Sequence, residues 1–234
     1  MSSTITKPTS SSASGQKMLQ AMVGIGMICA LLIVLTYEGT RDRIEKNRAE
    51  ALEQAIFKVL PGITRTAPYL ATAEGKFLPA TADNAKEGKL VYAGYNAEGD
   101  LAGIALTASG QGYADIIRVL YGYDPAQQAI VGLYVLESKE TPGLGDKIEK
   151  DLAFMENFRA LDVTLEDDLT QLKNRVVPVK HGNKEHPWEI DGITGATISS
   201  RAIGDLLGAS TEQWIPQIHQ QVEVFETSST EKNE

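Results

Sequence analysis

The feature that most constrains this chain is a run of 20 residues without a charged side chain, from Met18 to Tyr37. As an α-helix, a run of this length extends ~30 Å, which matches the hydrocarbon core of a bilayer. A buried helix of a soluble core is the alternative, but helices that are apolar on every face at this length are typical of membrane spans. We therefore predict a transmembrane helix over residues 18–37. The Ser- and Thr-rich residues 1–17 before it are expected to be a disordered tail.

The uncharged run is less typical of a cleaved leader. A signal peptide usually has a shorter apolar part, and no small-x-small cleavage site follows this run. Cys29 is preceded by the bulky Ile28, where a lipoprotein signal would carry a small residue. Because Cys29 is the single cysteine of the sequence, neither an internal disulfide nor a cysteine-based iron–sulfur or zinc site is expected. The run is predicted to be an uncleaved anchor.

Downstream of the anchor, the sequence predicts a juxtamembrane helix over residues 38–62. Glu38–Leu60 is rich in Arg, Glu, Ala and Leu, and it stops at Pro61-Gly62, a pair that ends helices. Residues 63–224 are predicted to form one α+β domain. The polar residues 225–234 are expected to be a flexible tail.

The domain is predicted to contain a mainly antiparallel sheet with flanking helices. A polar, loop-like stretch over residues 64–88 is followed by short strand-like runs with turn residues between them, a spacing typical of antiparallel strands. Expected strands cover Leu90–Tyr95, Gly103–Thr107, Ile116–Gly122, Ala129–Leu136 and Val176–Lys180. Expected helices cover Lys147–Phe158, Ser199–Leu207 and Trp214–Val224, with Pro216 in the first turn of the last one.

The composition argues against several classes of function. The net charge of −9 disfavours a nucleic-acid partner, and 42% hydrophobic residues are enough for a packed core. His181, His186 and His219 are too scattered to suggest a metal site. A P-loop is excluded because no Gly-Lys-Ser/Thr follows a glycine at the required spacing. No nucleophile with a neighbouring histidine is apparent, so no catalytic residue is predicted.

A turn of small residues, Thr194-Gly195-Ala196-Thr197, opens directly onto a predicted helix near the C-terminus. The first N–H groups of a helix lack partners and carry partial positive charge, which suits a phosphate or another anion. Gly195 and Ala196 allow a ligand to approach the backbone closely. Thr197 places a hydroxyl at the mouth of the turn. An ordinary N-cap is the alternative, because Thr is favoured at that position.

The stretch Asp191–Thr197 resembles the flavinylation motif of periplasmic FMN-binding domains. In that family the last Thr of the motif is joined through its hydroxyl oxygen to the phosphate of FMN. The resemblance implies one covalent FMN on Thr197, with Thr194, Gly195 and Ala196 as further contacts of the cofactor. It also implies a separate flavin transferase as a maturation partner, because nothing in the sequence suggests self-modification.

A second informative stretch joins a predicted strand to a predicted helix. Its residues are Glu140, Thr141, Pro142, Gly143, Leu144 and Gly145. Pro142 and Gly143 predict a tight turn, and Leu144 is an apolar side chain at its tip that a flavin ring would cover. A plain connection is the alternative. The stretch resembles a recurrent element of the same family, in particular of the G subunits of Rnf electron-transport complexes, although members often carry His where Ser138 stands.

A third stretch, Gly110–Ile116, resembles the Gly-x-Gly-Tyr segment of this family, but Ala114-Asp115 after Tyr113 departs from the usual pair of small residues. Together the three stretches imply a membrane-anchored flavoprotein subunit that relays electrons within an Rnf-type ion-translocating ferredoxin:NAD oxidoreductase complex. Such a redox carrier has no complete active site of its own, and its partners are other subunits of the complex. Two alternatives stay open: the C subunit of a sodium-translocating NADH:quinone reductase, and a non-redox, membrane-anchored assembly or ligand-binding module.

The charges that flank the span and the family resemblance disagree about topology. Lys and Arg are more numerous after the span than before it, which by the positive-inside rule predicts a cytoplasmic domain. The residues counted are Lys7 and Lys17 before the span, and Arg41, Arg43, Lys46 and Arg48 after it. The resemblance implies the periplasmic side of a bacterial inner membrane, with residues 1–17 in the cytoplasm. We follow the resemblance.

Overall fold

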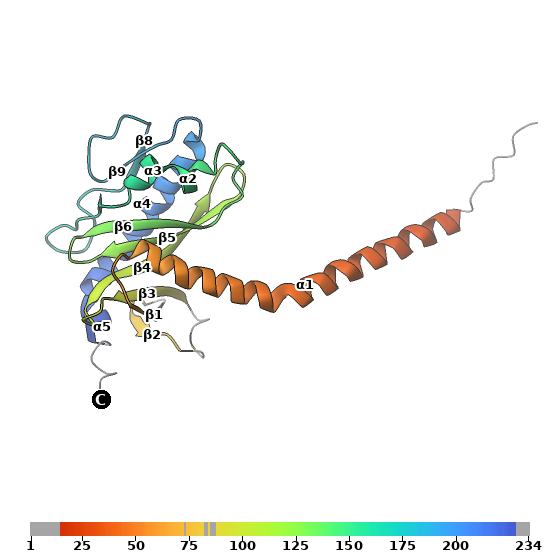
Figure 1. Ribbon diagram of the computed structural model, residues 1–234, viewed down its shortest axis with the longest axis horizontal. Coiled ribbons are helices and arrows are strands. Elements are labelled where there is room, and N and C mark those ends of the chain that lie inside the picture. The colour runs from red at the N-terminus through yellow and green to blue at the C-terminus, as the bar shows by residue number, and fades with distance from the viewer. Residues whose placement is uncertain (1–14, 73, 82–83, 85–87, 228–234) are drawn as a thin grey trace, which may run out of the picture. The chain divides into compact units, whose positions relative to one another are not determined.

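The structure is a computed structural model that describes residues 15–72, 74–81, 84 and 88–227 (Figure 1). The chain divides into two compact units, Met1–Glu50 and Ala51–Glu234. Most of the predicted N-terminal tail lies outside the described residues, as do residues 228–234. The last part of that predicted tail, from residue 15 on, is helical, so the helix begins earlier than predicted.

The first unit consists of most of helix α1 (Gly15–Val59), a single helix of 45 residues. It is the one helix in the described part of the chain that is long and apolar enough to cross a membrane. None of the residues in its most apolar stretch is buried against the rest of the protein. These properties fit a single-pass membrane anchor. The predicted span and juxtamembrane helix are therefore one continuous helix, because no proline interrupts the segment before Pro61.

The second unit contains the predicted antiparallel sheet. Seven strands pair in the order β2-β1-β3-β4-β5-β6-β7, and every pair in this sheet is antiparallel. The strands are β1 (Arg65–Ala71), β2 (Phe77–Pro79), β3 (Lys89–Tyr95), β4 (Leu101–Gln111), β5 (Ile116–Asp124), β6 (Ala129–Glu137) and β7 (Leu161–Asp162). The mainly antiparallel α+β fold is thus confirmed.

Strands β1 and β2 correct the prediction that residues 64–88 are loop-like. The Ala and Pro of this stretch have weak strand propensity, but β1 pairs with β3 along its whole length, with Tyr69 opposite Val91. Tyr69, Leu70 and Ala71 are buried there. Pairing and burial override local composition, which is the usual behaviour of strands.

The two faces of the sheet carry two separate hydrophobic cores. Along β4, Ile104 and Leu106 belong to the larger core, whereas Ala105 between them belongs to the smaller one, as expected for side chains that alternate across a strand. The larger core is covered by helix α4 (Thr197–Gln220), and the smaller by the end of α1 together with Leu60, which directly follows it (Figure 1). The sheet therefore fixes the position of α4 from one side.

The remaining helices and strands differ from the prediction in their continuity. The expected helix over residues 147–158 is two short helices, α2 (Lys147–Lys150) and α3 (Leu152–Glu156), because Asp151 adopts an extended backbone and caps α3 by accepting the N–H of Phe154. A separate two-stranded parallel sheet is formed by β8 (Val177–Val179) and β9 (Glu189–Asp191).

The two helices predicted over residues 199–207 and 214–224 are one helix, α4, with Pro216 in its interior. The intervening Gly208–Thr211 has weak helix propensity, but Ser210 and Thr211 are buried, and Thr211 Oγ1 donates to the carbonyl of Leu207 at 2.8 Å. Packing against the sheet thus keeps the helix continuous.

The domain also extends past the predicted boundary at residue 224. Helix α5 (Val222–Thr227) carries the buried Phe225, whose ring packs against two other rings. The centroid of the Phe225 ring lies 4.7 Å from that of Tyr69 and 5.1 Å from that of Phe77. The hydroxyl of Tyr95 donates to the Phe225 carbonyl at 2.7 Å. Residues 225–227 are therefore part of the fold, because an aromatic anchor holds them against β1 and β2.

The close packing of α1 on the sheet gives a stability prediction. A Cβ at Gly122 would lie 2.2 Å from the Val59 carbonyl oxygen, so Gly122→Ala forces two backbone segments apart. We expect the substitution to lower the free energy of unfolding by about 1–3 kcal/mol, as overpacking does. Urea unfolding of the detergent-solubilised chain measures this. Gly39→Ala is the control, since no atom lies within 4 Å of its added Cβ, and equal stability of both variants would contradict the prediction.

Candidate functional site

One pocket of about 320 Å³ brings together the three stretches singled out in the sequence. They come from the β4–β5 turn, the β6–α2 connection and the start of α4, which are far apart in the chain. The volume falls in the range typical of small-molecule sites. The lining residues are Tyr113, Glu140, Thr141, Leu144, Gly145, Gly195, Ala196, Thr197, Ile198 and Ser199.

Thr197 is the first residue of α4, and Ala196 occupies the N-cap position without a side-chain cap. The turn before it depends on Gly195, whose φ of +85° is readily adopted only by glycine. Thr197 is exposed, and its hydroxyl has no hydrogen-bond partner among the residues that the structure describes. The capping role is therefore not filled by Thr197, and a free hydroxyl lies beside the positive end of a 24-residue helix.

The buried carboxylate of Glu140 connects the three stretches to one another. Glu140 is only 6% exposed. One oxygen accepts the N–H of Ala114 at 3.0 Å, and the other accepts the hydroxyl of Ser199 in a short hydrogen bond. A Cβ at Gly145 would lie 2.5 Å from the second oxygen, so glycine is required for the loop to approach this carboxylate. Glu140 was predicted as a cofactor contact, and its observed partners also give it a positioning role.

The loop that follows Glu140 has the predicted tight turn. Gly143 has a φ of +78°, and its N–H donates to Asp146 Oδ1 at 2.7 Å. Lys150 Nζ donates to the other oxygen of Asp146 at 2.6 Å and lowers the pKa of that carboxyl below its ordinary value. Pro142 and Gly143 shape the turn but do not line the pocket, whereas Leu144 does.

Three large apolar side chains line the pocket while remaining open to solvent. Tyr113 is 66% exposed, Leu144 is 53% exposed and Ile198 is 57% exposed. An apolar planar ligand would cover surfaces of this kind, whereas a purely polar ligand would leave them in water. The side chains therefore suit a ring system in the pocket.

The structure adds three lining residues that were not predicted as contacts. Tyr113 belongs to the Gly-x-Gly-Tyr stretch, whose departure from the family pattern had left its contacts open. Ile198 and Ser199 directly follow Thr197 on the first turn of α4. The predicted helix began at Ser199; a predicted start at Thr197 would have indicated that both residues lie next to its hydroxyl. Thr194, by contrast, lies outside this pocket and lines an adjacent one.

The departures from the family pattern have structural explanations here. The backbone N–H of Ala114 bonds to Glu140, and the carboxylate of Asp115 pairs with Lys139 Nζ at 2.5 Å. This ion pair lowers the pKa of Asp115 and raises that of Lys139. Ser138 Oγ accepts the N–H of Glu140 at 3.2 Å. These contacts connect the β4–β5 turn to the β6–α2 connection.

One further hollow contains none of the predicted site residues. It has a volume of about 380 Å³, lies between α4 and the sheet, and is lined by Lys89, Arg118 and Trp214 among others. No group of three or more His, Cys, Asp or Glu residues that could hold a metal ion occurs in the part of the chain that the structure describes.

Comparison with known proteins defines first the domain and then the family. The sequence profile of the family described as FMN-binding domain matches residues 112–210, which include the whole pocket. A solved structure of the C subunit of the Na⁺-translocating NADH-quinone reductase from Parabacteroides distasonis has a similar fold, with a TM-score of 0.56 and 19% identity. The match covers 79% of this chain and 96% of that one.

Two curated proteins, each named as the G subunit of an ion-translocating oxidoreductase complex, are similar over most of their length. The protein from Methanosarcina acetivorans is 28% identical over 196 residues, covering 84% of this chain and 92% of the relative. A protein from Cereibacter sphaeroides is 31% identical over 180 residues, covering 76% of this chain and 74% of the relative. The chain belongs to the family of G subunits of ion-translocating oxidoreductase complexes.

The central position of Glu140 gives a second prediction. Glu140→Ala leaves the N–H of Ala114 and the hydroxyl of Ser199 without their buried acceptor, which costs about 2–3 kcal/mol in the free energy of unfolding. Urea unfolding and tryptic cleavage of the β6–α2 connection measure the loss of stability and of loop order. The control is Glu149→Gln, an exposed carboxylate on α2. Unchanged stability and cleavage in Glu140→Ala would show that the carboxylate does not hold these loops.

Proposed function

We propose that this chain is the membrane-anchored flavoprotein subunit of an ion-translocating oxidoreductase complex, carries one FMN joined covalently to Thr197, and relays electrons within the complex. The observation that supports this most directly is the pocket in which the free Thr197 hydroxyl, at an uncapped helix start, meets apolar side chains from two other stretches. A flavin has a matching division, with a phosphate at one end and an apolar ring system at the other.

The residues present suit a phosphate ester at Thr197. The uncapped N–H groups of α4 and the dipole of a long helix favour an anion there, and Gly195 leaves the backbone accessible. Formation of the ester requires a donor that holds the flavin phosphoryl group in a phosphoanhydride bond. The hydroxyl oxygen bonds to phosphorus and loses its proton to a base, while the anhydride P–O bond breaks and the rest of the donor leaves. No described side chain is hydrogen-bonded to the Thr197 hydroxyl, so we assign proton removal and phosphoryl activation to a separate flavin transferase.

Bound FMN supplies the redox chemistry, and the protein contributes binding and orientation. Tyr113, Leu144 and Ile198 provide apolar surface for the ring, and Glu140 holds the loops that carry the first two of these side chains in place. On this proposal the chain is a redox carrier whose electron donor and acceptor belong to other subunits, not an enzyme with a complete active site.

The alternatives differ in their support. The C subunit of the sodium-translocating NADH:quinone reductase has the same fold, but at 19% identity, whereas the G subunits reach 31%. A non-redox ligand-binding module would explain the pocket and the anchor. It would give no reason for a free hydroxyl at the mouth of an anion-binding helix start.

We also propose that the domain lies on the periplasmic side of the membrane, despite the excess of Lys and Arg after the span. The proposal rests on the family, whose flavin transferase is expected on that side. A complete apolar span is a strong insertion signal, so that flanking charge need not decide its direction alone.

Removal of the Thr197 hydroxyl tests the covalent attachment. Thr197→Val preserves the shape of the side chain and removes the oxygen that would carry the phosphate. In protein from the native host, we expect flavin fluorescence in denaturing gels to disappear and the intact mass to lose one FMN. Thr194→Val is the matched comparison, because it removes a hydroxyl beside Thr197 that has only a supporting contact, and it should reduce flavin content much less. Covalent flavin in Thr197→Val would refute the assignment.

Fusion of a reporter after Glu234 tests the topology. Alkaline phosphatase is active only after export, and green fluorescent protein exported by the Sec route stays dark. We expect an active phosphatase fusion and a dark fluorescent fusion. A bright fluorescent fusion with inactive phosphatase would place the domain in the cytoplasm, as the Lys and Arg count predicts.

A further inference from the structure

A second hollow, of about 250 Å³, adjoins Thr197, which lines both this hollow and the pocket described above. Its charged lining side chains are Lys180 and Arg201, it also contains His181, and none of its lining residues is acidic. The lining is therefore positively charged, although the chain has a net charge of −9. Among the described residues, neither Lys180 nor Arg201 has a carboxylate partner, whereas Lys139, Lys150 and Arg159 are each in an ion pair.

Rigid elements place the two cations beside Thr197. Arg201 lies four residues after Thr197 on α4 and therefore on the same side of the helix. Lys180 directly follows β8, which pairs in parallel with β9, so that Val179 lies opposite Asp191. The N–H of Gly192 donates to the Val179 carbonyl at 3.1 Å. The loop with Lys180 and the loop that leads to Thr197 thus leave the same edge of this small sheet.

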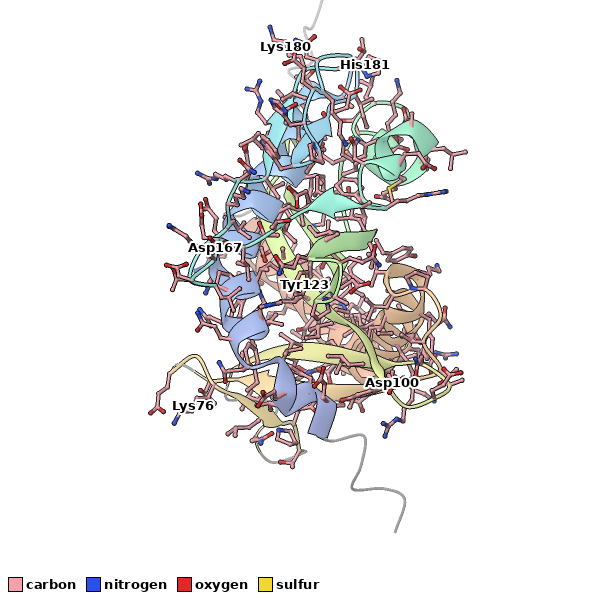
Figure 2. The ribbon with its side chains drawn as sticks, turned by 90° about the vertical axis from the view of Figure 1, so that its left-hand side faces the viewer. Lys76, Asp100, Tyr123, Asp167, Lys180 and His181 are labelled. Atoms are coloured by element: carbon pink, nitrogen blue, oxygen red, sulfur yellow. The ribbon has the colours of Figure 1, made fainter. Side chains whose placement is uncertain are left out.

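Asp191 holds the loop that carries Lys180 and His181. One oxygen of its carboxylate accepts the N–H of Gly182 at 2.7 Å, and the other lies 3.3 Å from His181 Nδ1. The backbone of Asp191 is fixed in turn by Asn157, which accepts its N–H at 3.0 Å and donates to its carbonyl at 3.2 Å. Figure 2 shows Lys180 and His181 next to each other at one end of the domain, with Lys76 at the other end.

We propose that this second hollow is an anion compartment in which Lys180 and Arg201 bind the phosphate of the flavin, while the first pocket receives the ring. The proposal rests on the function proposed above. It assigns the two cations a binding role, and it makes Asp191 a positioning residue that acts through the loop over residues 180–182. A phosphate ester at Thr197 is negative, and two cations without carboxylate partners compensate its charge at the positive end of α4.

Non-covalent binding to Thr197→Val isolates the compartment, because this variant cannot form the ester. The full-length variant in detergent is titrated with FMN and with riboflavin, which differ by the phosphate alone, and flavin fluorescence is followed. We expect FMN to bind about fivefold to tenfold more tightly than riboflavin, a modest factor because both cations are exposed. Adding Lys180→Gln and Arg201→Gln should remove most of this preference, leaving only the part due to the helix start, and should leave riboflavin binding unchanged. A higher salt concentration should also reduce the preference for FMN over riboflavin.

Two further variants separate a local site from general electrostatics. Lys76→Gln with Lys173→Gln removes the same number of exposed positive charges outside the hollow and should preserve the preference for FMN. Asp191→Ala removes a negative charge, so that charge alone would strengthen FMN binding. We expect it to weaken FMN binding because the loop over residues 180–182 loses its acceptor, with rescue by Asp191→Asn, which can still accept the N–H of Gly182.

The outcomes distinguish the two proposals. Equal binding of FMN and riboflavin would overturn the anion compartment and leave the ring pocket standing. A preference for FMN that is undiminished by Lys180→Gln with Arg201→Gln would assign the phosphate to the helix start alone and would also overturn the anion compartment. Binding of neither flavin would overturn both the compartment and the ring pocket on which the proposed function rests.

Discussion

The site depends on a carboxylate that is removed from water and accepts from two directions at once. Glu140 is bonded to the N–H of Ala114, 26 residues earlier in the chain, and to the hydroxyl of Ser199, 59 residues later. The two oxygens of the side chain are separate acceptors, so that they can satisfy an amide and a hydroxyl together. These two bonds fix the start of α4 against the β4–β5 turn and the β6–α2 connection. The positions of Thr197, Tyr113 and Leu144 relative to one another follow from them.

Sequence patterns predicted the parts of the fold that are governed by local regularity. Strands β3 to β6 carry enough β-branched and aromatic residues to be recognised, and Pro61-Gly62 marks the end of α1. Strand β1 was missed because its stability comes from pairing with β3 and from burial of Tyr69 rather than from its own composition. The continuity of α4 was missed for a similar reason, since the sheet compensates for weak helix formers in its middle.

The candidate site divides in the same way. Thr197 and the loop around Leu144 were found through motifs that are contiguous in the sequence. The contact between Glu140 and Ser199 joins residues that no local pattern connects, and the placement of Lys180 beside Thr197 depends on the parallel pairing of β8 with β9. His181, for which the sequence suggested no metal-binding role, lies in the same hollow. Spatial neighbours of this kind require the fold.

The exposure of the pocket bears on what a flavin held there could do. Tyr113, Leu144 and Ile198 are each more than half exposed, which places the pocket at the surface of the domain, where another protein can approach it. Enzymes that transform a small substrate at a flavin generally exclude water from the reacting atoms. An accessible ring is, however, what a carrier needs if its electron donor and acceptor are other subunits. The proposed attachment at Thr197 would then have a clear physical purpose, because a pocket at the surface with modest apolar contact would lose a freely dissociating flavin to solvent. A covalent bond would retain the cofactor, and the apolar side chains and the charges near Thr197 would set its orientation.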